Sequence, residues 1–340
     1  MTQEFTGTIL RGREFDPIEG RIVVEDGTIA AVEETSEADS TDLILPAFVN
    51  AHTHLGDSIA KEAGAGLTLD ELVAPPDGLK HRLLRAASDE ELTAAMERSL
   101  RYMQQGGTGA FIEFREGGVP GVRALSRAVE GLDIESVVFG RESIAAMEES
   151  DGFGASGARD SEFGREREAT RKAGKLFAIH AGERDAADID PALSLAPDML
   201  VHMVYAESDH LARLETTQTP VVVCPRSNLV TGVGLPPVRK LLDHTSVALG
   251  TDNVMLNSPS MFREMEFVSK LTEVSAREIL RMATIAGADA VGLNCGLIEE
   301  GRDARLLILD GGTDNLAGAR NPVRAVVRRA GVSDVKEVIM

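Results

Sequence analysis

The chain has 340 residues, 43% of them hydrophobic, which is enough for one large domain or for two domains with buried cores. Its formal net charge of −20 at pH 7 excludes a nucleic-acid partner, because the phosphates would be repelled. No apolar run is long enough to span a bilayer, and the N-terminus lacks a basic region followed by an apolar segment, so we expect no membrane partner and a cytoplasmic protein.

The first 34 residues contain short strand-like runs separated by turns, and Glu25-Asp26-Gly27 is typical of a hairpin turn between two of them. An apolar strand then runs from Leu43 to Val49 and leads into His52-Thr53-His54. Successive strand side chains point to opposite faces, so His52 and His54 share a face. By itself this pair is as typical of structural histidines as of metal ligands.

A connection of about 30 residues follows, rich in Gly and Pro, and loops of this length are often functional. It ends at a helix that begins with the capping box Ser88…Glu91 and stops at Gly106. From there, strand-like and helical stretches alternate. With the strand that ends at His54, eight candidate strands are present; the other seven cover residues 109–114, 135–141, 152–158, 175–183, 198–206, 220–228 and 246–253.

This alternation predicts an α/β fold in which a parallel sheet closes into a (β/α)8 TIM barrel. The tail, including GLIEEGRDARLLILD and PVRAVVRRAG, is read as strand-rich. We expect both chain ends to pair into a small β-sandwich. The predicted division is therefore residues 1–46 and 297–340 for the sandwich and 47–296 for the barrel.

Chemistry in such barrels takes place at the carboxyl ends of the strands, where four of the seven histidines fall. Closure of the barrel brings the eighth strand beside the first, so Asp252 is expected to meet His54. Three imidazoles and a carboxylate suit zinc or iron. The polar residues at strand ends are His52, His54, Glu113, His180, Glu183, His202 and Asp252.

Each of these residues also has an ordinary explanation. A lone strand histidine is usually a hydrogen-bonded core residue, Asp252 before Asn253 is typical of a turn, and a carboxylate such as Glu183 is commonly solvated. The strand-end position of Asp252 nevertheless favours ligation, and the position of Glu183, three residues after His180, favours the mouth of the barrel. The complete set at the strand ends of one barrel favours a metal site.

Several motifs together resemble the amidohydrolase superfamily, in the branch of cytosine, guanine and S-adenosylhomocysteine deaminases and triazine hydrolases. The resemblance covers nearly the whole chain. Its motifs are PAFVNAHTHLGD, HAGE at His180–Glu183, VHMVYA, CPRSNL, VALGTDN followed by SPSMFREMEF, and the tail GLIEEGRDARLLILD.

The resemblance implies that His52, His54, His180 and Asp252 bind one divalent metal ion, zinc or alternatively iron. Such an ion lowers the pKa of its bound water toward ~7 and so supplies hydroxide. Asp252 would accept the water proton, His202 would orient the attacking oxygen, and Glu183 would shuttle a proton to a ring nitrogen before ammonia leaves.

Departures from the family pattern bear on the metal count and on the substrate. Binuclear members carry a lysine on the fourth strand, and GFGASGARD has none, so a single metal ion is expected. FIEFREGG replaces the usual ending of the second strand. Arg115 is read either as a substrate-gripping residue or as part of a surface salt bridge. The residues proposed to bind substrate are Asp57, Lys80, His81, Glu113 and Arg115.

The expected function is a metal-dependent hydrolase, an aminohydrolase (deaminase) of a purine, pyrimidine or related amino-heterocycle. One alternative is hydrolysis of an amide, a cyclic amide or a carbon–halogen bond at the same site; another is a catalytically silent barrel that binds a small ligand. Relatives associate, so a homo-oligomer is also considered. With seven lysines against 28 arginines, the composition resembles that of proteins from salt-loving archaea.

Overall fold

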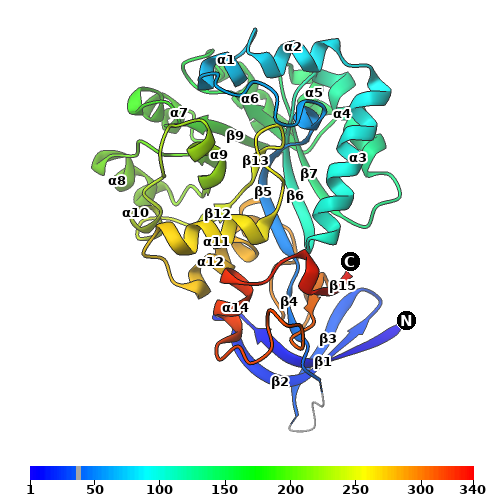
Figure 1. The fold of residues 1–340 in the computed structure, drawn as a ribbon. Helices are drawn as coiled ribbons and strands as arrows, with labels where there is room; N and C mark the ends of the chain where they lie inside the picture. Colours follow the sequence, from blue (N-terminus) through cyan, green and yellow to red (C-terminus); the bar gives the residue numbers. More distant parts are fainter. Residues whose placement is uncertain (36–39) are drawn as a thin grey trace.

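A computed structural model describes residues 1–35 and 40–340 and contains the expected barrel (Figure 1). Neighbouring barrel strands are parallel throughout. Only Gly250 and Thr251 separate β12 from β13, and β13 pairs with β5, so the eighth strand closes the sheet onto the first. The strands are β5 (Phe48–His54), β6 (Thr108–Arg115), β7 (Glu135–Gly140), β8 (Gly152–Ala155), β9 (Leu176–Ala181), β10 (Met199–His202), β11 (Val221–Val223), β12 (Val247–Leu249) and β13 (Asp252–Asn253).

Helices surround this barrel and connect its strands. The expected capping box of Ser88 and Glu91 begins α3, and a second capping box, formed by Ser275 and Glu278, begins α12. From residue 89 to residue 291 these helices are α3 (Asp89–Gln105), α4 (Gly118–Val129), α5 (Ile144–Glu148), α6 (Gly164–Ala173), η2 (Ala186–Asp188), α7 (Ile189–Ser194), α8 (Ser208–Thr217), α9 (Pro225–Val230), α10 (Val238–Leu242), α11 (Met261–Leu271), α12 (Ala276–Met282) and α13 (Ile285–Val291). Within the described part of the chain, no helix is long and apolar enough to cross a membrane.

The chain ends form a second sheet with its own apolar core. The predicted hairpin joins β2 to β3, and Asp26 and Gly27 adopt φ of 47° and 80°, as a type I′ turn requires. After β4, only Ala47 precedes the first barrel strand, so the sheet leads directly into the barrel. Its strand order is β15 (Val335–Ile339), β14 (Leu306–Leu309), β4 (Leu43–Pro46), β1 (Thr2–Arg11), β2 (Asp16–Glu25) and β3 (Thr28–Glu34).

One part of the tail was predicted wrongly: PVRAVVR forms helix α14 (Pro322–Arg328) and not a strand. Pro322 occupies the first turn, where its missing N–H costs nothing, and Asn321 caps the helix by accepting from Arg324 N. Val323 and Val326 are buried in the apolar cluster that also contains residues of α11 and α12. The spacing of three between these valines is helical, although valine itself favours strands.

The long connection after β5 also contains regular structure, namely η1 (Leu55–Ala60), α1 (Leu69–Val73) and α2 (Leu79–Ala86). Thr68 and Glu71 form a capping box that starts α1. In Figure 1 these elements lie at the carboxyl end of the barrel strands, opposite the sheet of the chain ends. The connection is therefore placed to cover the predicted site.

Candidate metal centre

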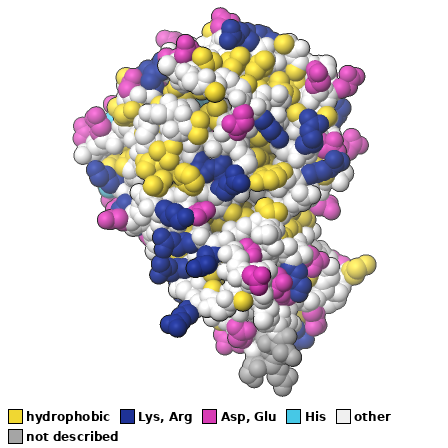
Figure 2. All heavy atoms as spheres, viewed as in Figure 1, with side chains coloured by type: hydrophobic (Ala, Val, Ile, Leu, Met, Phe, Trp, Pro, Cys, Tyr) yellow, Lys and Arg dark blue, Asp and Glu magenta, His cyan; other side chains and the backbone are white. Residues whose placement is uncertain are grey.

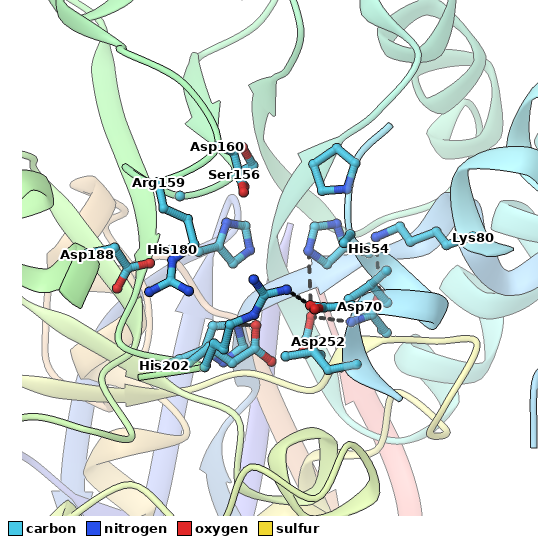
Figure 3. A pocket seen from close by; sticks show the side chains of 18 of the residues that line it. His54, Asp70, Lys80, Ser156, Arg159, Asp160, His180, Asp188, His202 and Asp252 are labelled. Atoms are coloured by element: carbon cyan, nitrogen blue, oxygen red, sulfur yellow. Dashed lines mark hydrogen bonds and ion pairs between the residues drawn. The ribbon is translucent and has the colours of Figure 1, made fainter. Parts of the chain in front are cut away.

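Four side chains, those of His52, His54, His180 and Asp252, converge from three parts of the barrel at its carboxyl end. Figure 3 labels three of them, His54, His180 and Asp252. The Nε2 atoms of His52 and His180 are 3.3 Å apart. Asp252 Oδ1 lies 3.4 Å from Nε2 of His52 and 3.5 Å from Nε2 of His54. The barrel thus brings together the four residues that the sequence predicted as one ligand set.

These residues fit a divalent cation. The ligand atoms of His52, His54 and His180 lie within 4.8 Å of one another, as do those of His52, His202 and Asp252. Nδ1 of His180 lies 2.8 Å from the carbonyl oxygen of Ala155, so Nδ1–H donates and Nε2 keeps its lone pair for a metal. Imidazole and carboxylate donors suit zinc or iron.

His202 and Glu183 lie beside this cluster. Nε2 of His202 is 3.5 Å from Glu183 Oε2. The Asn228 amide contacts both side chains, at 3.2 Å from Nδ1 of His202 and 3.4 Å from Glu183 Oε1. Asn228 therefore orients the two groups relative to each other.

The carboxylate of Asp252 is held on both oxygens. Ser227 donates to Oδ2 at 2.6 Å, and Asn253 donates to Oδ1 at 3.0 Å. Asp252 and His202 also have φ of 58° and 79°, a left-handed conformation that non-glycine residues rarely adopt. Such strain persists only where the surroundings hold it, and it clusters at functional sites.

Burial determines the protonation states. It lowers the pKa of His52, and it lowers that of His54 to about 3, so both imidazoles are neutral, the form that binds metals. Burial opposes ionisation of Asp252, but contacts with His52, His202 and His54 outweigh it and hold the Asp252 pKa well below its usual range. Burial raises the pKa of Glu183, a shift that favours the protonated form that a proton donor needs.

The cluster opens into a cleft (Figure 3). One wall comes from α1 and the connection after it, with Leu69, Val73 and Pro75 as its apolar part. Arg184, just after β9, forms an ion pair with Asp70 of α1 across the cleft. Charged and polar residues that also line the cleft include Arg141, Ser156, Arg159 and Asp160.

The five residues proposed to bind substrate are in different places. Lys80 and His81 line the cleft. Asp57 lies beneath it, accepting from Met255 N at 3.0 Å. Glu113 accepts from Leu55 N and Thr53, and Arg115 donates to Gly121 O, so neither reaches the cleft. Strand alternation explains this: Phe114 points into the barrel against His52, and its two neighbours therefore point outward.

Sequence reasoning missed Glu116, Arg141, Asn228 and Ser227. Ser227 and Asn228 lie within the CPRSNL motif, which was recognised only as a family signature. Glu116 has the same strand parity as Phe114, so the alternation of β6 was a signal that could have found it. Arg141 follows β7 and carries no local signal.

The sequence is similar to a known protein family over most of its length. The model of the amidohydrolase family matches residues 43–338. An uncharacterized protein of Methanocaldococcus jannaschii is 36% identical, covering 96% of this chain and 94% of its own. A 5-methylthioadenosine/S-adenosylhomocysteine deaminase of Pyrococcus abyssi is 24% identical, with 98% and 91% covered.

A solved structure extends the comparison to three dimensions. The adenosine deaminase of Xanthomonas campestris with bound zinc superposes with a TM-score of 0.79 at 18% identity, covering 99% of this chain and 91% of that one. This likeness shows the shared fold. The resemblance inferred from the motifs is confirmed by the family match. The chain belongs to the amidohydrolase family and is an enzyme that hydrolyses carbon–nitrogen bonds.

Proposed function

We propose that the protein is an aminohydrolase that removes an amino group from a purine, pyrimidine or related heterocycle, using one divalent metal ion, with zinc preferred. The observation that carries this proposal is the position of Glu183. Its side chain, with a raised pKa, lines the same cleft as the metal-site residues and lies 3.5 Å from His202.

His52, His54, His180 and Asp252 would hold the ion. A divalent metal supplies a water of lowered pKa and thus a nucleophile at neutral pH. Asp252, kept ionised by its neighbours, accepts the proton of the attacking water. Its bonds from Ser227 and Asn253 keep the carboxylate aimed into the site.

Glu183 and His202 act on the substrate side. The protonated carboxyl of Glu183 donates to a ring nitrogen, which makes the carbon that bears the amino group more electrophilic. His202 orients the oxygen that attacks this carbon. The carboxylate of Glu183 then takes up the hydroxyl proton of the tetrahedral adduct, and the proton that Asp252 accepted from water passes to the amino group, which leaves as ammonia. Asn228 keeps both side chains in place for these transfers.

The choice of substrate class rests on chemistry and on relatives. A general acid beside a nucleophilic water can protonate a ring nitrogen while the water attacks the adjacent carbon that carries the amino group. The Pyrococcus abyssi relative, named a 5-methylthioadenosine/S-adenosylhomocysteine deaminase, is similar over nearly its whole length.

The test is ammonia release by the metal-loaded protein from a panel of amino-purines, amino-pyrimidines and their nucleosides. The panel also includes amide, cyclic amide and halogenated heterocycle substrates. Ammonia from an amino-heterocycle supports the proposal. Turnover of only the amides or halides, or a folded protein that binds no divalent metal, contradicts it.

A further inference from the structure

Glu116, just after β6, reaches a histidine of the metal centre from outside the cluster. It is buried, with 2% of its surface exposed, and its Oε1 lies 2.7 Å from Nδ1 of His54. Nδ1 of His54 also lies 3.1 Å from the carbonyl oxygen of Phe114. Both neighbours are acceptors, so the proton of the neutral ring is on Nδ1 and the lone pair is on Nε2.

The three histidines differ in what faces Nδ1. His180 has a backbone carbonyl, from Ala155, and Nδ1 of His52 has no hydrogen-bond partner among residues 1–35 and 40–340. For His54 the structure places a carboxylate there. A carboxylate that accepts from a metal-bound imidazole orients the ring and increases its basicity more than a neutral carbonyl does.

Two buried cations hold this carboxylate in place. Glu116 Oε1 lies 2.7 Å from Lys80 Nζ and 2.8 Å from Arg141 Nη1. Lys80 also donates to Asn253 Oδ1 at 3.0 Å, and Asn253 bonds Asp252. The network therefore connects the ligands of the first and eighth strands, His54 and Asp252, through side chains that are themselves almost completely buried.

We infer that Glu116 is a positioning residue for metal binding, which sets the tautomer and the orientation of His54 so that Nε2 faces the ion. This inference rests on the proposed metal site but on no particular substrate. It assigns a role to a residue that need not touch substrate or the reacting atoms.

Metal affinity tests this role. Glu116→Gln keeps an acceptor and removes the charge, whereas Glu116→Ala removes both. We expect metal affinity, measured by competition with a chromophoric chelator, to fall about 10-fold in the first variant and up to about 100-fold in the second. The absorption spectrum of the cobalt-loaded protein should also change, because one ligand is reoriented.

Glu264→Gln is the matched control. It makes the same change at a completely buried carboxylate that is paired with Arg226 and contacts no proposed metal ligand, so its metal affinity and cobalt spectrum should stay close to those of the unaltered protein. If Glu264→Gln weakens metal binding as much as Glu116→Gln does, the loss reflects any buried charge change and the inference fails. Unchanged affinity and spectrum in both Glu116 variants would also overturn it.

Three further outcomes can be told apart. If a Glu116 variant does not fold by circular dichroism, the double variant Glu116→Gln/Lys80→Met, in which two opposite charges are removed together, is compared with Lys80→Met. If the unaltered protein binds no metal, the proposed function and this inference both fail. If it binds metal and only the Glu116 comparison is negative, the proposed function stands.

Discussion

At the level of single residues, the site depends on carboxyl groups in different environments. Burial raises the pKa of Glu183. Burial opposes ionisation of Asp252, but contacts with the surrounding histidines lower the pKa of Asp252 and hold it ionised. The two environments thus shift the pKa values of these neighbouring carboxyl groups in opposite directions, as the proposed proton donor and proton acceptor of one site require. Neutral side chains orient both carboxyl groups: Ser227 donates a hydrogen bond to Asp252, and Asn228 donates one to Glu183.

Glu183→Gln should retain bound metal and lose most turnover, about 10²–10⁴-fold, because the amide cannot give and take a proton. Turnover of the best substrate in the panel and metal content by elemental analysis measure the two effects. Glu215→Gln, at an exposed position of α8, is the control. Turnover close to that of the unaltered enzyme would remove Glu183 from its proposed role.

Asp252→Ala should lower both metal affinity and rate. The change removes a ligand, the proposed acceptor of the water proton, and the partner of Ser227 and Asn253. We expect weaker metal binding in the chelator competition together with a large loss of turnover. A folded variant with full metal content and an unchanged rate would show that Asp252 lies outside the functional site.

At the level of elements, hydrogen bonds of side chains near helix ends join neighbouring helices of the barrel. Glu278 closes the capping box of α12 and also accepts from Arg239 of α10 at 2.7 Å. Burial opposes its ionisation, but hydrogen bonds from Arg239 and Ser275 outweigh burial and lower the Glu278 pKa to about 2. One carboxylate thus joins two helices that flank the eighth strand.

Glu278→Gln should reduce the free energy of unfolding by about 1 kcal/mol at pH 7, a value discounted because the side chain is partly exposed. The contribution of a carboxylate with a lowered pKa is complete above the pKa of the unfolded chain, about 4.5, and is lost as pH falls toward 2. Urea unfolding of both proteins should therefore converge in acid. Glu273→Gln, at an exposed position, should show no such difference, and a gap that persists at low pH would contradict the assignment.

For the whole molecule, the surplus of carboxylates is the dominant electrostatic feature. The chain has 55 acidic and 35 basic residues, and the two kinds are unevenly distributed over the surface (Figure 2). Figure 2 shows a face on which Lys and Arg side chains gather over the region of α11 and α14. Other surfaces must then carry more than their share of negative charge, and this charge repels itself in the compact state.

Salt should consequently stabilise the protein. Raising KCl from about 0.1 M to about 1 M shortens the Debye length from ~10 Å to ~3 Å, so self-repulsion weakens and Tm should rise. A variant with Glu90, Glu130, Glu215 and Glu273 changed to Gln, all exposed, should show a smaller rise. Thermal melts at both salt concentrations measure this, and an equal rise in both proteins would mean that net charge is not the cause.

The sequence by itself determined the eight barrel strands, the hairpin at Asp26-Gly27 and the residues that converge on the metal site. These features follow from local patterns: apolar runs, turn residues, and polar side chains at strand ends, which a closed parallel barrel must bring together. The α14 segment was missed because its valines favour a strand locally, while packing against α11 and α12 favours a helix.

Only the tertiary structure decided which side chains at the strand ends face the cleft. Glu113 and Arg115 point away from it and Glu116 points toward His54, since β6 presents Phe114 to the barrel interior. Glu116, Lys80 and Arg141 come from three different connections between barrel strands, and their spacing in the sequence does not predict that they meet. Long-range contacts of this kind depend on how the barrel closes and on how the covering helices pack, so they emerge only when the chain is folded.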